Sequence, residues 1–268
     1  MLSWYWILRH EMNADFERRF GGTSRLYGEE TFARFHGAHV CVVGIGGVGS
    51  WAAEALARSG IGKLTLIDLD NIAESNTNRQ IHALGDEYGK AKVLAMADRI
   101  HAINPACEVT MIEEFVDAQN LDQMLGRGYD AVLDAIDQTR VKAAMIAWCK
   151  AQGVYIVSTG AAGGQTDPTR VRVTDLTQTI QDPLAARVRS LLRKEYGFTR
   201  DAKKKFGVEF VFSDEPIKYP QQACDTGDGV DGTNAAPEGL NCAGFGSSVC
   251  VTAVFGFVAA SRVLAAIT

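Results

Sequence analysis

The six cysteines of this sequence form no C-x-x-C pair, and that absence argues against two classes of protein at once. Structural zinc sites and disulfide scaffolds place cysteines at short, repeated spacings, whereas these are scattered singly along the chain. No export signal directs them to an oxidising compartment. We therefore expect a cytoplasmic protein with reduced thiols and no zinc, in which Cys41 and Cys250, both within apolar runs, are small core residues.

Positive charge is also scarce, because 27 Lys and Arg against 32 Asp and Glu give a net charge of −5. This argues against a surface uniformly coated for nucleic acid, although a local basic patch can still bind one. Residues 243–260 carry no charge and reach about the length at which a membrane span must be considered. The small residues of that run favour a buried core or subunit-interface helix, with a membrane segment as the alternative.

Alternating short apolar runs and longer helical patterns fill the first part of the chain. Strands are expected at residues 40–43, 64–67, 109–112, 131–133 and 155–157, and helices at 51–59, 90–103, 121–125 and 140–151. This rhythm, with right-handed crossovers, predicts an α/β fold with a Rossmann-like, doubly wound, mainly parallel sheet. Residues 1–160 are interpreted as a nucleotide-binding core with an N-terminal arm.

The regular alternation of strand and helix patterns ends after residue 160. An antiparallel strand is expected at 171–173, a helix from 183 towards 196, a surface loop at 216–240, and an apolar helix at 243–266. The loop is rich in Pro, Gly, Asp and Asn and has no periodicity. We therefore expect residues 161–268 to form a smaller C-terminal antiparallel and helical region that continues the same fold and faces the substrate.

A glycine-rich loop follows the first strand. Gly44, Gly46 and Gly49 have the G-x-G-x-x-G spacing, with Gly47 between them, and a helix is expected directly afterwards. Such a loop turns tightly, lets phosphates approach the backbone, and directs the N–H groups of the helix N-terminus at the anion. Alone, the motif fits a dinucleotide, ATP, or an ordinary structural turn.

The residues after the loop discriminate between these ligands. Asp68 and Asp70 follow the second strand, where an acid can bind a ribose. A triphosphate that is about to be cleaved also needs cations on its oxygens and an acid for Mg²⁺, and Arg79, Lys92 and Asp137 supply that set. A nicotinamide cofactor has no use for these three residues.

Each of these three residues also has an ordinary interpretation. Arg79 follows a turn and is typical of a solvated surface charge. Lys92 and Lys90 together fit a charged helix face. Asp137 fits the N-cap of the helix expected at residue 140. Their combination, rather than any one of them, carries the prediction.

The ordered motifs GIGGVGS, DLD-x-x-x-x-SNTNRQ and DAID resemble the ATP-binding core of the ubiquitin-activating-enzyme-like superfamily, over residues 25–159. The resemblance implies that Asp68 binds the ribose, that Arg79 and Lys92 hold phosphates, and that Asp137 handles Mg²⁺. By the same resemblance Asn76, in SNTNRQ, belongs to the nucleotide site.

Upstream of the core, Arg25 lies in the motif SRLYG. It resembles an arginine that the partner subunit of a homodimer in this superfamily inserts at the triphosphate. A homodimer is therefore expected by resemblance alone.

Three motifs in the second half, GGQTDPT (163–169), TIQDPLAARVR (179–189) and NCAGFGS (241–247), resemble the tRNA threonylcarbamoyladenosine dehydratases of this superfamily. The resemblance implies ATP-dependent cyclisation of a threonylcarbamoyl group on a tRNA adenosine through an acyl-adenylate. Two other classes remain as alternatives. One is an adenylyltransferase for a ubiquitin-like or sulfur-carrier protein, and the other is an NAD-dependent oxidoreductase.

A tRNA substrate calls for basic residues, and the segment 187–205 contains eight: Arg187, Arg189, Arg193, Lys194, Arg200, Lys203, Lys204 and Lys205. We expect this basic segment to lie beside the loop above the ATP site and to bind the phosphate backbone, with a solvated helix face as the alternative. Cys224 and Cys242 are interpreted as incidental thiols rather than thioester cysteines. The sequence leaves open a monovalent cation and a sulfur-transfer partner such as a cysteine desulfurase.

Overall fold

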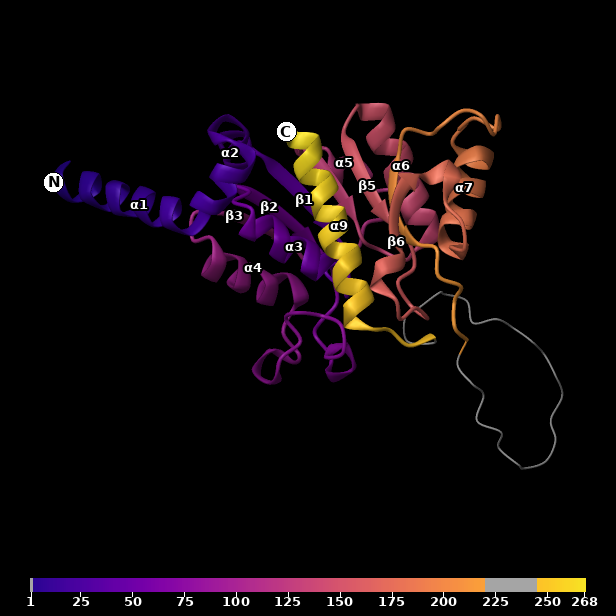
Figure 1. The fold of residues 1–268 in the computed structure, drawn as a ribbon, viewed down its shortest axis with the longest axis horizontal. Helices are drawn as coiled ribbons and strands as arrows, with labels where there is room; N and C mark the ends of the chain where they lie inside the picture. Colours follow the sequence, from indigo (N-terminus) through magenta and orange to yellow (C-terminus); the bar gives the residue numbers. More distant parts are fainter. Residues whose placement is uncertain (1, 220–244) are drawn as a thin grey trace, which may run out of the picture.

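Seven strands form one sheet in the part of the chain that the computed structural model describes, residues 2–219 and 245–268, with 2–14 described by their backbone alone (Figure 1). The order is β3-β2-β1-β4-β5-β7-β6, and only β6 and β7 pair antiparallel. The strands are β1 (His39–Val43), β2 (Lys63–Ile67), β3 (Glu108–Ile112), β4 (Ala131–Asp134), β5 (Tyr155–Thr159), β6 (Val171–Asp175) and β7 (Glu209–Ser213). The predicted doubly wound, mainly parallel sheet is confirmed.

Helices cover both faces of this sheet. They are α2 (Glu29–Gly37), α3 (Gly49–Arg58), α4 (Lys92–Ile103), α5 (Leu121–Leu125), α6 (Thr139–Gln152), α7 (Pro183–Glu195) and α9 (Val249–Ile267), whereas α1 (Leu2–Tyr27) packs on α2 and extends away from the sheet (Figure 1). Alternate residues of a strand point to opposite faces. Thus Val40 and Val42 of β1 face a core shared with α2, α3, α4 and α9, whereas Cys41 and Val43 face a core shared with α5, α6 and α7.

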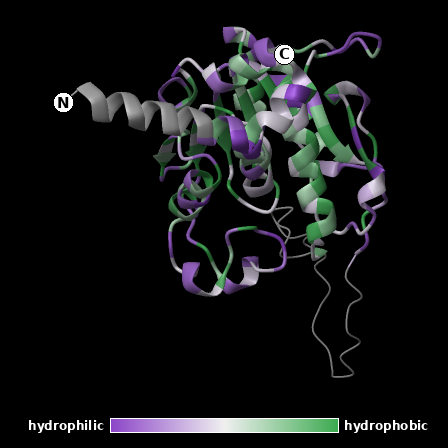
Figure 2. Cartoon of the chain, turned by 60° about the vertical axis from the view of Figure 1, so that its left-hand side comes forward, coloured by the Kyte–Doolittle hydropathy of each residue, from purple (hydrophilic) through white to green (hydrophobic). Residues whose placement is uncertain are grey.

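The C-terminal helix α9 lies against α3, the helix that follows the glycine loop (Figure 1). Gly256 permits this close approach, since a Cβ there would lie 2.5 Å from the Val48 carbonyl oxygen. Figure 2 shows α9 as a largely hydrophobic helix. It is long and apolar enough to cross a membrane, yet Val251, Phe255 and Val263 are fully buried in the core.

Several elements differ from the sequence-based expectation. α4 begins at Lys92 rather than at residue 90, because Gly89 has a φ of 85° and Lys90 instead pairs with Glu87 and Asp98. The helices α1 and α2 and the strand β7 were not predicted, and most of the expected loop 216–240 lies outside the described residues. The apolar helix begins at Val249 rather than at residue 243, within the described part of the chain.

The cysteine prediction is confirmed at one position and wrong at another. Cys41 is fully buried in β1, as expected for a small core residue. Cys250 is exposed, because it lies at the start of α9 on the side of the helix that faces away from the core. Both are free thiols. Cys224 and Cys242 lie outside the described residues.

Candidate active site

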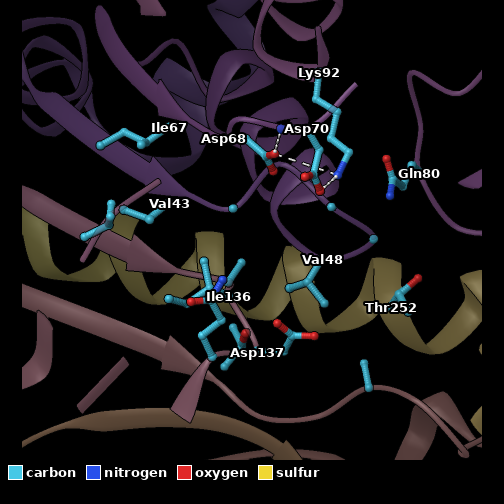
Figure 3. A pocket seen from close by; sticks show the side chains of 18 of the residues that line it. Val43, Val48, Ile67, Asp68, Asp70, Gln80, Lys92, Ile136, Asp137 and Thr252 are labelled. Carbon is cyan, nitrogen blue, oxygen red and sulfur yellow. Dashed lines mark hydrogen bonds and ion pairs between the residues drawn. The ribbon is translucent and has the colours of Figure 1, made fainter. Parts of the chain in front are cut away.

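A cavity of about 390 Å³ opens at the carboxyl ends of the parallel strands. It spans the point between β1 and β4 where the strand order reverses, which is where open α/β sheets bind ligands. Its walls come from the loops that follow β1, β2, β3, β4 and β5, and Thr252 of α9 closes one side (Figure 3). Most of the residues singled out in the sequence therefore meet in one place.

The glycines of the loop have separate physical roles. Gly44 has a φ of 87°, which residues with a Cβ rarely adopt. A Cβ on Gly49 would lie 1.8 Å from the Gly44 carbonyl oxygen, so Gly49 lets α3 begin directly against the loop. Gly46 and Gly47 line the cavity, and a Cβ on Gly46 would meet no atom within 4 Å. The space in front of Gly46 is available to a ligand.

One wall of the cavity is acidic and tightly hydrogen-bonded (Figure 3). Asp68 accepts from the Ile45 N–H at 2.6 Å and from the Asp70 N–H at 2.9 Å. Burial raises the pKa of Asp68, and the Lys92 ammonium opposes that rise. The carboxylate is thus fixed by the N–H groups of Ile45 and Asp70.

Lys92 is a buried member of this wall rather than a solvated charge. Its Nζ lies 2.7 Å from Asp70 Oδ2 and 3.8 Å from Asp68 Oδ1. Its pairing with Lys90 on one helix face does not occur, because Lys90 precedes the helix. Asp70 therefore serves as the countercharge that holds Lys92 at the cavity.

Asp137 lies across the cavity from this wall, in the loop between β4 and α6 (Figure 3). It is exposed, and it does not cap α6, since Gln138 occupies the N-cap position without a side-chain hydrogen bond. Arg79 lines the cavity beside Gly47 and donates to the Ser75 carbonyl oxygen at 2.8 Å. Within residues 15–219 and 245–268 Arg79 forms no ion pair with a carboxylate.

Three of the expected site residues do not line the cavity. Gly49 supports the loop from behind, as described above. The Asn76 side chain is buried and accepts from the Ala73 N–H at 3.1 Å, so it shapes the turn that precedes Arg79. Arg25 is exposed on α1 and is not part of the cavity of its own chain.

The structure also adds residues that the sequence did not single out. Gln80 is 6% exposed and lines the cavity, and its Oε1 has no partner among the described residues. Thr252 reaches the cavity from α9, and residues 159–162 also line it. Gln80 could have been assigned to the cavity because it directly follows Arg79 in the sequence. No pattern in the sequence points to Thr252.

Comparison with known proteins shows to which family the chain belongs. The family model described as ThiF family matches residues 22–268. The chain belongs to the ThiF family. It is 54% identical to the tRNA threonylcarbamoyladenosine dehydratase of Escherichia coli (strain K12) over 92% of each chain. Crystal structures of the E. coli dehydratase in complex with ATP and with AMP both match at a TM-score of 0.83 and 51% identity, covering 94% of each chain.

The likeness to another ThiF relative is shorter. The molybdopterin-synthase adenylyltransferase of E. coli is 36% identical, but only over 47% of this chain and 49% of its own length. Likeness to the dehydratases therefore extends well beyond the stretch shared with that adenylyltransferase. Within the ThiF family this chain is grouped with the dehydratases.

The Mg²⁺ expected for this ThiF chain would have to share its ligands with a nucleotide. No group of three His, Cys, Asp or Glu side chains able to hold a metal occurs in the described residues. Mg²⁺ commonly binds through one or two carboxylates together with substrate phosphates and water. The exposed Asp137 carboxylate at the cavity wall fits that requirement.

Lys203, Lys204 and Lys205 of the basic segment do not lie where they were expected. Residues 203–205 precede β7, which runs parallel to β5, so they lie at the amino ends of the strands, opposite the cavity. Arg189 donates to the carbonyl oxygens of Leu176 and Thr179, and Arg193 is also held internally. The prediction that this segment lies above the ATP site is wrong for residues 203–205, because the unrecognised strand β7 runs from them across the sheet towards the cavity. The exposed basic side chains are Arg187, Lys194, Arg200, Lys203, Lys204 and Lys205.

Proposed function

We propose that this chain uses ATP to dehydrate threonylcarbamoyladenosine in tRNA to its cyclic form. The likeness to the E. coli dehydratase over nearly the whole length of both chains carries the proposal. A carrier-protein adenylyltransferase would share the nucleotide half alone, as the molybdopterin-synthase relative does. An NAD-dependent oxidoreductase would have no use for Arg79, Lys92 and Asp137.

The first step joins the substrate to AMP. The adenosine ribose binds Asp68, and the phosphates follow the loop past Gly46 towards Arg79. The threonyl carboxylate attacks the α-phosphate, the bond to the bridging oxygen breaks, and pyrophosphate leaves. Negative charge that develops on the phosphate oxygens is stabilised by the cations Arg79 and Lys92. The product is an acyl-adenylate.

The second step closes a ring. A nucleophilic atom of the carbamoyl group attacks the activated carbonyl carbon, loses its proton, and displaces AMP, which carries away the former carboxylate oxygen. The substrate has then lost one water overall, and ATP has become AMP and pyrophosphate. Because nucleophile and electrophile belong to one molecule, their proximity supplies much of the rate. No covalent enzyme intermediate is required.

Asp137 would hold Mg²⁺ with the triphosphate. The ion, when bound, neutralises charge on the phosphate oxygens during the attack. The contribution of the chain is to present a carboxylate with no competing partner in the described residues opposite the Asp68 wall. A cytoplasmic location fits this use of ATP and tRNA together with reduced thiols.

We further propose a homodimer in which Arg25 of the partner subunit completes the site. Arg25 is exposed and lies outside the cavity of its own chain, so it acts on a triphosphate only from another subunit. Lys203, Lys204 and Lys205, at the amino ends of the strands, bind tRNA phosphates at a distance from the reacting group, because tRNA is long enough to span both edges of the sheet.

The proposal is tested with tRNA bearing threonylcarbamoyladenosine, ATP and Mg²⁺. After incubation the nucleosides are analysed by mass spectrometry, and we expect a product lighter by one water together with AMP and pyrophosphate. The matched control is the Asp137→Ala protein under the same conditions. No mass loss with a folded, ATP-binding preparation would refute the proposal. ATP–pyrophosphate exchange that depends on a protein ending in Gly-Gly would instead support the carrier-protein reading.

A further inference from the structure

A lysine and an aspartate form a fully buried ion pair beneath the cavity. Lys142 Nζ, in the first turns of α6, lies 2.7 Å from Asp134 Oδ2 and 3.1 Å from Ser158 Oγ. Ser158 also donates to Asp134 Oδ2, at 2.5 Å. All three residues are 0% exposed. None of them lines the cavity, and the proposed reaction uses none of them directly.

Burying these charges carries a free-energy cost. Burial lowers the pKa of Lys142, and Asp134 opposes that shift, with smaller opposing effects from Asp182 and Asp137. Well-packed apolar side chains of similar volume often serve stability as well as a buried ion pair, or better. Stability alone is therefore a weak explanation for a lysine at position 142. Its hydrogen bonds indicate a role in positioning the loop that follows β4.

The ion pair bridges the two ends of the loop that carries Asp137. Asp134, the last residue of β4, precedes the loop and accepts from the Ile136 N–H at 3.2 Å through its other carboxylate oxygen. Lys142 follows the loop and also donates to the Asp134 carbonyl oxygen at 3.5 Å. Through Asp134 the ammonium fixes the backbone directly before Asp137.

The same cluster reaches a neighbouring part of the cavity lining. Thr159 donates from its hydroxyl to the Asp134 carbonyl oxygen at 3.3 Å, and Thr159 itself lines the cavity. The contacts thus connect β4, β5 and α6 at the one edge where the nucleotide would bind. A displacement of Lys142 would therefore also shift Asp137 and residues 159–162.

We propose that Lys142 is a positioning residue for adenylation, which holds Asp134 and thereby fixes residues 135–138 so that the Asp137 carboxylate faces the triphosphate. This inference rests on the proposed function for its kinetic readout. Lys142 touches neither ATP nor substrate. The Asp68 wall lies across the cavity from Asp137 (Figure 3) and is fixed by the Ile45 and Asp70 N–H groups, so the ribose end of the nucleotide site does not depend on Lys142.

The test compares Lys142→Met with Lys150→Met. Lys150 lies on the same helix, is exposed, and among the described residues donates only to the Gly207 carbonyl oxygen, so it controls for loss of a lysine from α6. For Lys142→Met we expect kcat to fall about 100-fold, as for a misplacement of about 1 Å. We expect KM for ATP to stay within about threefold of the wild-type value. Lys150→Met should match the wild type in both.

A second readout does not need activity. Amide hydrogen exchange at Ile136, measured by NMR on the full chain, should accelerate in Lys142→Met and not in Lys150→Met, because the Asp134 acceptor is no longer fixed. Unchanged kcat, or unchanged Ile136 exchange, would overturn the inference. A parallel loss of kcat and ATP affinity would also overturn it, since that outcome marks a purely structural role.

Ser158→Ala provides a gentler variant in case Lys142→Met does not fold. It removes one hydroxyl from the cluster, and we expect kcat to fall by about threefold to tenfold with faster Ile136 exchange. If the wild-type protein, the variants and the Lys150→Met control all lack dehydratase activity, the dehydratase proposal is refuted. Ile136 exchange would still decide the role of Lys142. Wild-type kcat and exchange in Ser158→Ala would count against that role.

Discussion

Alanine at Gly46 should stabilise the protein while it weakens ATP binding. Gly46 lies outside the positive-φ region, and its Cβ would meet no atom within 4 Å. Replacing glycine where alanine fits stabilises by about 0.4–1 kcal/mol, through the unfolded state. For a chain of this size that raises Tm by roughly 1–4 °C. The new methyl group would nevertheless occupy the space proposed for a phosphate.

The loss of ATP affinity follows from overpacking. Forcing a methyl group into an occupied contact costs about 1–3 kcal/mol. At about 1.4 kcal/mol for each factor of ten, Kd for ATP should rise roughly 5- to 150-fold. Isothermal titration calorimetry measures Kd, and differential scanning calorimetry measures Tm on the same preparation. An unchanged Kd would refute the placement of the phosphates against Gly46.

Gly49→Ala is the matched contrast. Its Cβ would lie 1.8 Å from the Gly44 carbonyl oxygen, so the start of α3 must move even without ligand. We expect a loss of about 1–3 kcal/mol or more in the free energy of unfolding. Tm should therefore fall by roughly 2–12 °C. A melting curve like that of the wild type would show that α3 does not approach the loop as closely as described.

The other predictions concern charge. Arg79→Ala and Asp137→Ala should each lower kcat by about 100- to 1,000-fold with an unchanged circular dichroism spectrum, and near-normal turnover in either would contradict its role. Neutralising the lysines at 203–205 to glutamine should weaken tRNA binding and reduce the slope of log K against log salt by about 2 to 3, whereas an unchanged slope would leave them as solvated charges. ATP affinity should fall as pH falls through the raised pKa of Asp68, since the protonated acid is a poorer acceptor. Lys92→Met removes the charge that lowers the pKa of Asp68, so the loss of ATP affinity should begin at higher pH. Calorimetric titrations at several pH values measure this, and an ATP affinity that does not change with pH would contradict the prediction.

The nucleotide half of the fold was accessible from sequence because its signals are local. The apolar run of β1 and the G-x-G-x-x-G spacing that follows it are both contained in one short stretch of chain, so they can be recognised without knowledge of distant contacts. Asp68 and Asp137 could be assigned to the cavity because the carboxyl ends of parallel strands share one edge. Local pattern plus one topological rule was sufficient.

The remaining features depend on contacts between distant segments. β7 is inserted between β5 and β6 against the order of the chain, and this insertion places residues 203–205 at the edge opposite the cavity. Lys142 resembles an ordinary helix lysine until β4 and β5 surround it. Thr252 lines the cavity only because α9 lies against α3. None of these pairings leaves a periodic trace in the sequence.

The contact between α9 and α3 has a consequence for the order in which the protein is made. The glycine loop and α3 leave the ribosome early, whereas the surface that supports them through Gly256 is translated near the end of this sequence. Until then the apolar flank of α3 is uncovered, and such surfaces attract chaperones or aggregate. The nucleotide pocket is thus complete only after α9 has been translated, about 200 residues after the glycine loop.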